Sequence, residues 1–507
     1  MKHKIFSLII QTIVATLIFG TGLSLAQEPF TLEKSLEISM KNSPNIQHSQ
    51  LSLERSQQML NARLASLKSQ FSLTLNPITY NIGKKFDTYY NPLLQKYFSA
   101  WYTNIEKQVS GDFTIRQPIK MTNGTLSLIN SFWWLDDYRE IPSGNLGEIT
   151  KVQSKTFNNN LRLSYQQPLF TYNQTKLETR DLELDFENAA LNYAIQKLFL
   201  EYQVTQSFFN VYQKKSSVDV SIDEYNNRTQ SYNIIKNKVE AGLEAREELY
   251  QAELDMTSSK SNVQNNQTDL ENFLDAFKQL IGLSIYDDIT VTADISHRPA
   301  EVGLQKALDT ALKYRMELRQ RKIDIENSQY ALIQASATNE FRGDLVLSYG
   351  IIGNDDKFEN MYDVPTKNQQ VSIEFNIPLF DWGRRKSTIK AFEASVKNSE
   401  LSLEDQKNDI IIEVRRTYRN LKNLVNQIEI ANQNVRNAQL TYDINLERYK
   451  NGDITSMDLN LFQNQLSKAK MDKISSLINY KLELLNMKVL SLYDFEKNRR
   501  VVTDGVE

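Results

Sequence analysis

Apolar residues recur along the chain with two different periods, and the period predicts which segments are strands and which are helices. Four segments alternate apolar and polar residues, which places the apolar side chains on one face of a β-strand. The apolar positions are Phe71, Leu73 and Leu75; Leu161, Leu163 and Tyr165; Leu345, Leu347 and Tyr349; and Val371, Ile373, Phe375 and Ile377. This pattern fits either an amphipathic sheet over a soluble core or a lipid-facing barrel with a wet lumen.

A second pattern, with heptad spacing, predicts very long helices. The clearest seam comprises Val414, Tyr418, Leu421, Val425, Ile428, Asn432, Val435, Gln439, Tyr442, Leu446 and Tyr449. Residues 386–449 contain no Pro or Gly, so nothing in them interrupts a helix. At ~1.5 Å per residue such a helix is roughly 95–100 Å long and must project from any compact domain. Asn432 and Gln439 are expected to weaken the seam, fix its register and permit sliding.

The chain contains an internal duplication, which constant residue offsets reveal. Pro168-Leu169-Phe170 recurs as Pro378-Leu379-Phe380, an offset of 210 residues. Residues 238–254 resemble residues 448–464 at the same offset. Two such units predict pseudo-symmetry within one chain.

Each unit carries a proline and a glycine at opposite ends of its long helical pattern. Pro cannot donate to a strand ladder and is tolerated in the first turn of a helix, so Pro168 and Pro378 are predicted strand-to-helix hinges. Gly242 and Gly452 are predicted to end the long helices in the left-handed conformation, with a second helix after each turn. Each unit is therefore predicted to be a long antiparallel helical hairpin with strands at one end.

The N-terminal residues and the composition indicate an exported protein. Lys2 and Lys4 precede an apolar run that ends in Ser24-Leu25-Ala26, so residues 1–26 are predicted to be a secretory signal peptide. The chain has no Cys, which excludes lipoprotein acylation, disulfides and thiolate metal sites. The net charge of −3 gives no indication of nucleic acid binding.

Four predicted strands cannot form a closed membrane structure within one chain. Single-chain membrane barrels begin at about eight strands, and each unpaired amide at an open edge costs several kcal/mol in hydrocarbon. If the strands lie in a membrane, symmetric copies of the chain must complete one barrel and join the helical hairpins into a tube.

These features together resemble the TolC-type outer-membrane efflux protein family over nearly all of the chain after residue 26. The residues that carry the resemblance are Pro-Leu-Phe-Asp-Trp-Gly at 378–383, its weaker copy at 168–172, and the glycine-turn segments 242–254 and 452–464. The resemblance implies a mainly α fold with a β-barrel, in which long helical hairpins form an α-barrel. It also implies a homotrimer in outer-membrane lipid, with a twelve-stranded barrel built from four strands per chain.

The resemblance and the patterns together predict the domain organisation after the signal peptide. The predicted segments are first helices at 27–70, first barrel strands with a long extracellular insertion at 71–168, a periplasmic helical hairpin at 169–282, an equatorial linker with a short strand at 283–300, first helices of the second unit at 301–342, second barrel strands at 343–378, a second periplasmic hairpin at 379–492, and an equatorial tail at 493–507.

The first unit is longer than the second. Residues 35–57 resemble residues 307–329 at an offset of 272, so the first unit carries 62 additional residues, all within Asn76–Asn160. Asn123-Gly124 predicts a hairpin tip there. One interpretation is an elaborated extracellular loop with a hairpin, and the alternative places Phe132-Trp133-Trp134 in an interfacial aromatic girdle.

The resemblance assigns a periplasmic gate to the helix tips. An aspartate of the family, six residues after each tip glycine, corresponds to Asp458 and Glu248, and a family tyrosine corresponds to Tyr449. A further family aspartate and an arginine are replaced by Leu461 and Ile454. Rings of Asp458 and Glu248 would make the entrance anionic and mildly cation-selective. Alternatively, these acids are ordinary exposed residues of a helix.

The residue types predict a conduit without enzymatic activity, cofactor or metal. His3, His48 and His297 are scattered, and no nucleotide-binding or nucleophile motif is present. By the resemblance, a periplasmic adaptor (membrane fusion protein) contacts the tips at Gly242 and Gly452 and connects the duct to an inner-membrane pump or ABC exporter. The predicted function is the passive exit duct of a tripartite efflux or type I secretion system, for a metal ion, small molecule or protein. The alternative is a periplasmic or surface coiled-coil protein without a pore.

Overall fold

The computed structural model describes residues 30–91, 95–142, 149–296 and 300–501, so the predicted signal peptide lies outside the described residues. The chain divides into two compact units. The sheet unit contains residues 53–189 and 320–404, and the tip unit contains the described residues up to 52, residues 190–319 and those from 405 onward.

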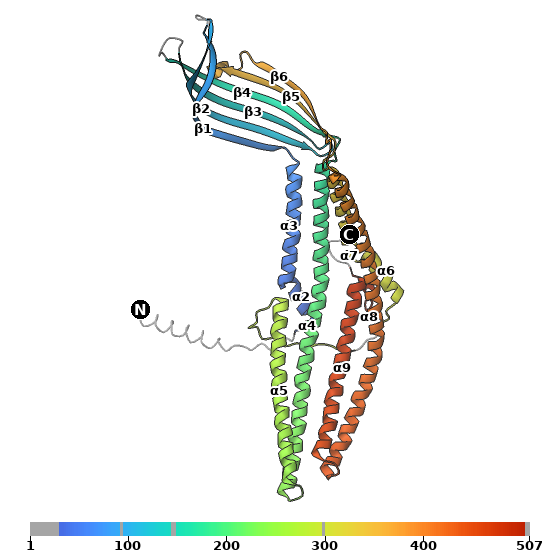
Figure 1. Ribbon diagram of the computed structural model, residues 1–507. Helices are drawn as coiled ribbons and strands as arrows, with labels where there is room; N and C mark the ends of the chain where they lie inside the picture. The colour runs from blue at the N-terminus through green and yellow to red at the C-terminus, as the bar shows by residue number, and fades with distance from the viewer. Residues whose placement is uncertain (1–29, 92–94, 143–148, 297–299, 502–507) are drawn as a thin grey trace, which may run out of the picture. The chain divides into compact units, whose positions relative to one another are not determined.

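The sheet unit is built on one six-stranded antiparallel sheet in which every strand pairs with its neighbour in sequence (Figure 1). Its strands are β1 (Gln70–Asn91), β2 (Lys96–Ile119), β3 (Gly124–Pro142), β4 (Ile149–Leu169), β5 (Arg342–Asp355) and β6 (Thr366–Asn376). The four strands predicted from the sequence correspond to β1, β4, β5 and β6. The predicted count is wrong, because the sheet also contains β2 and β3.

The two additional strands come from the insertion, which forms a hairpin paired within the sheet. The extracellular position of the insertion stays a prediction. Asn123, with φ of +63°, turns the chain between β2 and β3, as its Asn-Gly sequence predicted. Charged residues obscured these strands in the sequence, but Lys107 and Asp136 lie directly opposite each other in the register. Opposite charges on neighbouring strands are compatible with a sheet.

An irregularity in β1 also hid the strand pattern. The pairing with β2 shifts between Asn76 and Thr79, which is a β-bulge. Apolar residues occupy odd positions before the bulge, as at Leu75, and even positions after it, as at Tyr80. Their partners Gly111 and Lys107 lie on the same face of β2, so the bulge keeps the apolar residues on one face of the sheet.

Helices continue from the strands at one end of the sheet. α3 (Pro44–Ser66) leads into β1 and α7 (Met316–Ser336) leads into β5, while α4 (Gln174–Glu240) follows β4 and α8 (Arg384–Asn451) follows β6. The remaining elements are α2 (Leu32–Asn42), α5 (Arg246–Ile281), α6 (Leu304–Tyr314), η1 (Phe358–Asn360), α9 (Ser456–Ser491), β7 (Tyr493–Asp494) and β8 (Arg499–Arg500). Of the helices in the described ranges, none is long and apolar enough to cross a membrane.

In the tip unit, α5 and α9 follow α4 and α8 after short turns, which gives two long helical hairpins (Figure 1). An apolar core around Phe208 and Phe277 packs α4 against α5 and includes Phe30 and Ile478. The segment predicted as an equatorial strand contributes one parallel bridge, between Val291 and Phe30.

The 68 residues of α8 are uninterrupted, as the absence of Pro and Gly predicted. Its buried stripe comprises Ile410, Val414, Thr417, Leu421, Ile428, Ala431, Tyr442, Asn445 and Tyr449. Five of these belong to the predicted seam. Asn432 is exposed, and Gln439 donates a hydrogen bond to Asp443 on its own helix. Their effect on the register and sliding of the seam stays a prediction.

Candidate functional site

Both helix tips turn through the same glycine motif. Gly242 and Gly452 have φ of +74° and +88°, a left-handed conformation that an L side chain rarely adopts. The amide of Leu243 donates to the carbonyl of Lys238 at 2.8 Å, and that of Asp453 donates to the carbonyl of Arg448 at 2.9 Å. These are the wider hydrogen bonds of a Schellman motif, and they satisfy helix-end carbonyls that would otherwise lack a partner.

The carboxylate of Asp458 caps the start of its own helix, α9. It accepts hydrogen bonds from the Thr455 hydroxyl at 2.9 Å and the Thr455 amide at 3.2 Å, while the Asp458 amide donates to the Thr455 hydroxyl at 3.2 Å. This reciprocal capping box fixes the orientation of the side chain, which is exposed.

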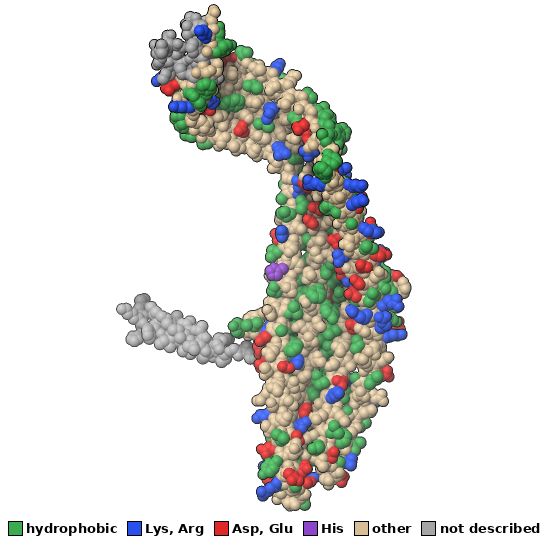
Figure 2. All heavy atoms as spheres, in the orientation of Figure 1, with side chains coloured by type: hydrophobic (Ala, Val, Ile, Leu, Met, Phe, Trp, Pro, Cys, Tyr) green, Lys and Arg blue, Asp and Glu red, His purple; other side chains and the backbone are tan. Residues whose placement is uncertain are grey.

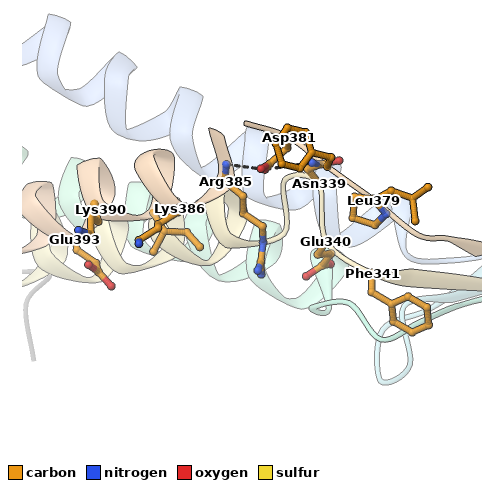
Figure 3. Close-up of a pocket in the computed structure, with 12 residues that line it drawn as sticks. Asn339, Glu340, Phe341, Leu379, Asp381, Arg385, Lys386, Lys390 and Glu393 are labelled. Carbon is orange, nitrogen blue, oxygen red and sulfur yellow. Dashed lines mark hydrogen bonds between the residues drawn. The ribbon is translucent and has the colours of Figure 1, made fainter. Parts of the chain in front are cut away.

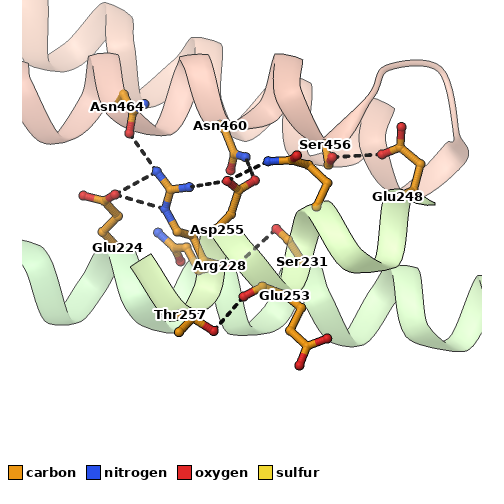
Figure 4. Close-up of polar contacts among 12 residues, drawn as sticks. Glu224, Arg228, Ser231, Glu248, Glu253, Asp255, Thr257, Ser456, Asn460 and Asn464 are labelled. Atoms are coloured by element: carbon orange, nitrogen blue, oxygen red, sulfur yellow. Dashed lines mark hydrogen bonds and ion pairs between the residues drawn. The ribbon is translucent and has the colours of Figure 1, made fainter. Parts of the chain in front are cut away.

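The carboxylate of Glu248 connects the two hairpins. It lies half-buried in the first turn of α5 and accepts a hydrogen bond from the Ser456 hydroxyl, in the first turn of α9, at 2.9 Å (Figure 4). Glu248 and Asp458 correspond in the internal repeat but have different surroundings. The first joins two hairpins, whereas the second stabilises one helix end.

The third predicted gate residue, Tyr449, is at the centre of the tip packing. Its side chain is buried in an apolar cluster with Ile235 on α4, Ala252 on α5, and Leu459 and Leu466 on α9. Burial raises the pKa of its hydroxyl, and nearby carboxylates, first Glu248, raise it further. The phenol therefore stays neutral at physiological pH.

Two hydrogen bonds join Tyr449 to α4. The Tyr449 hydroxyl donates to the carbonyl of Ser231 at 3.4 Å, and the Lys238 ammonium donates to the carbonyl of Tyr449 at 3.2 Å. The second bond places a cation at the C-terminal end of α8, where the helix dipole favours positive charge. α8 is thus held to α4 by both apolar and polar contacts.

A polar network that no sequence pattern predicted surrounds Arg228 on α4 (Figure 4). The guanidinium donates to Glu224 at 3.0 Å and to Asn464 on α9 at 2.9 Å, and it lies 4.0 Å from Asp255 on α5. Asn460 on α9 donates to Asp255 as well. These five residues, the Arg228 network, join three helices, and all of them except Glu224 line a polar hollow.

Only one contact of the Arg228 network was accessible to sequence reasoning. Glu224 and Arg228 are four residues apart on one helix, a spacing that favours an ion pair. Asp255 and Asn464 are brought to Arg228 by the packing of the hairpins. The two residues that depart from the family pattern lie close by: Ile454 packs against the apolar cluster, and Leu461 is exposed beside the hollow.

The two predicted hinges lie at the helix end of the sheet and differ in detail. Pro168 is the second-last residue of β4 and pairs with Asp344 on β5. α4 begins at Gln174. Asn173 caps α4 by accepting from the amide of Lys176 at 2.8 Å. Phe170 takes a positive φ of +61° between the strand and this cap.

The second hinge is organised by Asp381 rather than by Pro378 itself (Figure 3). Its carboxylate accepts from the amides of Gly383 at 3.0 Å and Arg385 at 2.9 Å, on either side of Arg384, where α8 begins. The hydrogen bond from the Arg385 amide, above all, lowers the pKa of Asp381. The Arg385 guanidinium donates to the carbonyl of Ser336 at the end of α7, at 3.0 Å and 2.9 Å. Asp381 and Arg385 therefore join the start of α8 to the end of α7.

Comparison with known protein families gives one match. Residues 307–488 match the family described as outer membrane efflux protein. The matched segment extends from α6 to α9 and contains β5, β6 and the second tip. No curated protein matches the chain.

Several solved outer-membrane channels have the same fold. The CmeC channel of Campylobacter jejuni is 15% identical, with a TM-score of 0.66 over 93% of this chain and 87% of that one. VceC of Vibrio cholerae is 13% identical, with a TM-score of 0.63 over 91% of this chain and 96% of that one. MtrE of Neisseria gonorrhoeae, solved in an open state, is 14% identical, with a TM-score of 0.62 over 91% and 88%.

Proposed function

We propose that this chain is the exit duct of a tripartite efflux or type I secretion system, because residues 307–488 match the outer membrane efflux protein family and the chain has the fold of solved outer-membrane channels. In this proposal it is a passive channel, closed at the helix tips and opened by its partners. The sheet lies in the outer membrane and the helical hairpins extend into the periplasm.

The observation that carries this proposal is the amphipathic sheet with two open edges. One face of the sheet exposes apolar side chains on every strand. They include Phe71, Leu73, Leu75, Val109, Phe113, Leu126, Leu161, Leu163, Leu347, Tyr349, Val371, Ile373 and Phe375. In hydrocarbon such a face is stable, but the free edges of β1 and β6 are not. Association of copies into a closed ring removes these edges, and the family resemblance sets the number of copies at three.

Two aromatic clusters, one at the helix end of the sheet and one further along the strands, support its placement in the bilayer. Phe170, Phe341 and Phe375 stack at the helix end, and Phe132, Phe157 and Phe358 pack together further along the strands. The 13 residues of β4 and its hinge that separate Phe157 from Phe170 extend about 43 Å at ~3.3 Å per residue. A tilt of ~45° gives about 30 Å, the thickness of a hydrocarbon core.

The second hinge adds apolar side chains at the same boundary. Leu379, Phe380 and Trp382 are largely exposed, and Figure 2 shows hydrophobic side chains gathered where β6 meets α8. Aromatic residues at this level are typical of the membrane interface. Within the insertion, the same reasoning favours a position in the aromatic girdle for Phe132 and Trp134. Trp133 points to the opposite face of the sheet, because neighbouring residues of a strand alternate between the faces.

We assign the gate to the contacts between the two hairpins. Tyr449, Glu248 and the Arg228 network hold α4 and α5 to α8 and α9, so opening the tips requires these contacts to separate. Arg228 supplies the polar latch that the family pattern places at position 454, where this chain has Ile454. An adaptor bound around Gly242 and Gly452, coupled to an inner-membrane pump or ABC exporter, would provide the energy for opening.

The acidic residues at the tips would then define an anionic entrance. Asp458 is exposed, and Glu240, Glu244, Glu247 and Glu248 lie beside the first tip. Threefold repetition of these carboxylates would attract cations and divalent blockers. Asp458→Asn should weaken block by divalent cations in single-channel recordings, and unchanged block would argue against the assignment.

Reconstitution of the full chain tests the proposal as a whole. Purified protein in lipid bilayers should form a heat-modifiable trimer that resists carbonate extraction and conducts ions. A coiled-coil spacer without a pore would be extracted by carbonate, run as a monomer and leave the bilayer without conductance.

A further inference from the structure

The hairpin formed by β2 and β3 has the same two faces as the rest of the sheet, at the same level along the strands. One register row of the sheet is polar on all six strands: Gln70, Arg116, Ser127, Ser164, Ser348 and Gln370. The adjacent row is apolar on the first five strands and ends on a polar residue of β6: Phe71, Ile115, Leu128, Leu163, Tyr349 and Gln369. Because neighbouring residues of a strand point to opposite faces, the inserted hairpin shares both the apolar face and the polar face.

The tip of this hairpin is fixed at the helix end of the sheet. The Asn123 carboxamide accepts from the hydroxyl and amide of Thr175, in the first turn of α4, at 2.7 Å and 3.0 Å. The side chain of Gln167 on β4 donates to the carbonyl of Thr122 at 2.6 Å. A side chain at Gly124 would come within 3.1 Å of the backbone of Gln166. The hairpin is therefore an integral part of the sheet at its helix end.

The insertion also preserves the direction of the sheet edges. Adding two strands to a meander leaves the first and last strands antiparallel, so β1 runs opposite to β6. A neighbouring copy can therefore add its β6 beside β1 and continue the antiparallel alternation. An odd number of added strands would have brought parallel edges together.

On the basis of the proposed trimer, we infer that this chain forms an eighteen-stranded barrel, six strands from each copy, in place of the twelve that the family resemblance implies. Each free edge is occupied by a second copy of this chain. Barrel diameter grows roughly linearly with strand number, so this barrel is about half again as wide as one of twelve strands, and barrels of 16–18 strands leave an aqueous channel. The membrane segment would then not restrict passage, and selection among solutes would fall to the tips.

Electron cryo-microscopy of the full-length chain in lipid nanodiscs tests this inference directly. Eighteen strands in a closed ring are expected. A ring of twelve, with β2 and β3 outside it, overturns the inference and leaves the proposed channel intact. A monomer without a ring overturns both.

Thiol labelling in the conducting channel provides a second test, because the chain has no Cys of its own. Ser127→Cys and Leu128→Cys lie on the inserted β3, and Ser164→Cys and Leu163→Cys are their register partners on β4. A charged, membrane-impermeant thiol reagent should label Ser127→Cys and Ser164→Cys at rates within about threefold, and should lower the single-channel current in both.

The two apolar positions are the matched controls. Leu128→Cys and Leu163→Cys should remain unlabelled by the charged reagent and react with a lipid-soluble maleimide. If Ser164→Cys lowers the current and Ser127→Cys does not, the hairpin lies outside the lumen and the inference fails, while the proposed function stands. If neither the parent chain nor any of the variants conducts ions, the proposed function fails.

Discussion

At the scale of single residues, Arg228 joins the two hairpins through Asn464 on α9 and pairs with two carboxylates of its own hairpin. Its side chain is only 12% exposed and pairs with groups on three helices. Arg228→Met leaves Glu224 and Asp255 close together without a cation, which should destabilise the closed tips by about 1–3 kcal/mol. The expected result is more frequent spontaneous opening in planar bilayers.

The control for Arg228 is a cation with an exposed partner. Lys397 on α8 pairs with Glu400 at 3.3 Å, and both side chains are largely in solvent. Lys397→Met should change opening frequency little, because exposed pairs contribute about 0–1 kcal/mol. Equal opening frequencies for Arg228→Met and the parent chain would show that Arg228 does not contribute to the gate.

The raised pKa of Tyr449 predicts how the helix tips respond to alkaline pH. Its pKa is raised in the folded protein by burial and by Glu248, Glu244 and Asp255, so folding favours the neutral phenol. This contribution to stability is complete below the unfolded pKa of about 10 and is lost as pH rises above it. Closed channels should therefore open more often above pH ~10.

Tyr449→Phe isolates the ionisation from the packing. The variant retains the ring in the apolar cluster and loses one weak hydrogen bond to Ser231, worth about 0.5–1.5 kcal/mol. The alkaline opening should disappear in Tyr449→Phe. Its persistence at unchanged amplitude would assign the effect to another group.

At the scale of elements, the two tip turns depend on glycine for the same reason. Gly242 and Gly452 both have positive φ, and a Cβ at Gly452 would meet Lys238 only at ordinary contact distance. Gly242→Ala and Gly452→Ala should each destabilise their turn by about 1–2 kcal/mol through the backbone alone. Gly83→Ala, on β1 with open space around its Cβ and no positive φ, should have little effect in the same thermal unfolding assay.

The hinge between β6 and α8 depends on Asp381 in a pH-dependent way. Hydrogen bonds, first from the Arg385 amide, lower its pKa, so its stabilising contribution is present above the unfolded pKa of about 3.9. The contribution is lost as pH falls through the lowered folded value. Asp381→Ala should accelerate amide hydrogen exchange at Gly383 and Arg385 near neutral pH. Equal exchange rates at pH 7 would contradict the capping role.

At the scale of the whole molecule, the two faces of the sheet predict opposite responses to charge. Leu347 and Ser348 are neighbours on β5 and point to opposite faces. Leu347→Arg places a charge against lipid and should destabilise the inserted protein by about 2–4 kcal/mol near the bilayer midplane. Ser348→Arg should insert and form trimers normally but change the ion selectivity, as measured by reversal potentials.

The number of strands changes what the whole molecule can transport. If the barrel contains eighteen strands, the tips rather than the membrane segment limit the size of the solute. The chain then has a wide exit controlled by a narrow, anionic entrance, and the Arg228 network and Tyr449 become the main determinants of passage.

The sequence by itself determined the features that depend on local chemistry. Gly242 and Gly452 end their helices because glycine, which has no Cβ, adopts the left-handed conformation at low energetic cost. Residues 384–451 form one helix because neither Pro nor Gly interrupts them. The alternation of residues on β4, β5 and β6 was visible because apolar residues recur at every second position over short runs, such as Val371, Ile373 and Phe375.

Only the tertiary structure decided the features that depend on pairing between distant segments. The strands β2 and β3 contain charged residues, which in the sequence are typical of a loop. Their place in a sheet is explained only by the strand register, in which Lys107 lies opposite Asp136. Arg228 meets Asn464 across 236 residues of sequence, and Asn432 turns away from the packed stripe of α8. Periodicity specifies which face of an element is apolar, but the partner of each side chain is fixed only when the elements pack, because packing selects one register among many that share the same period.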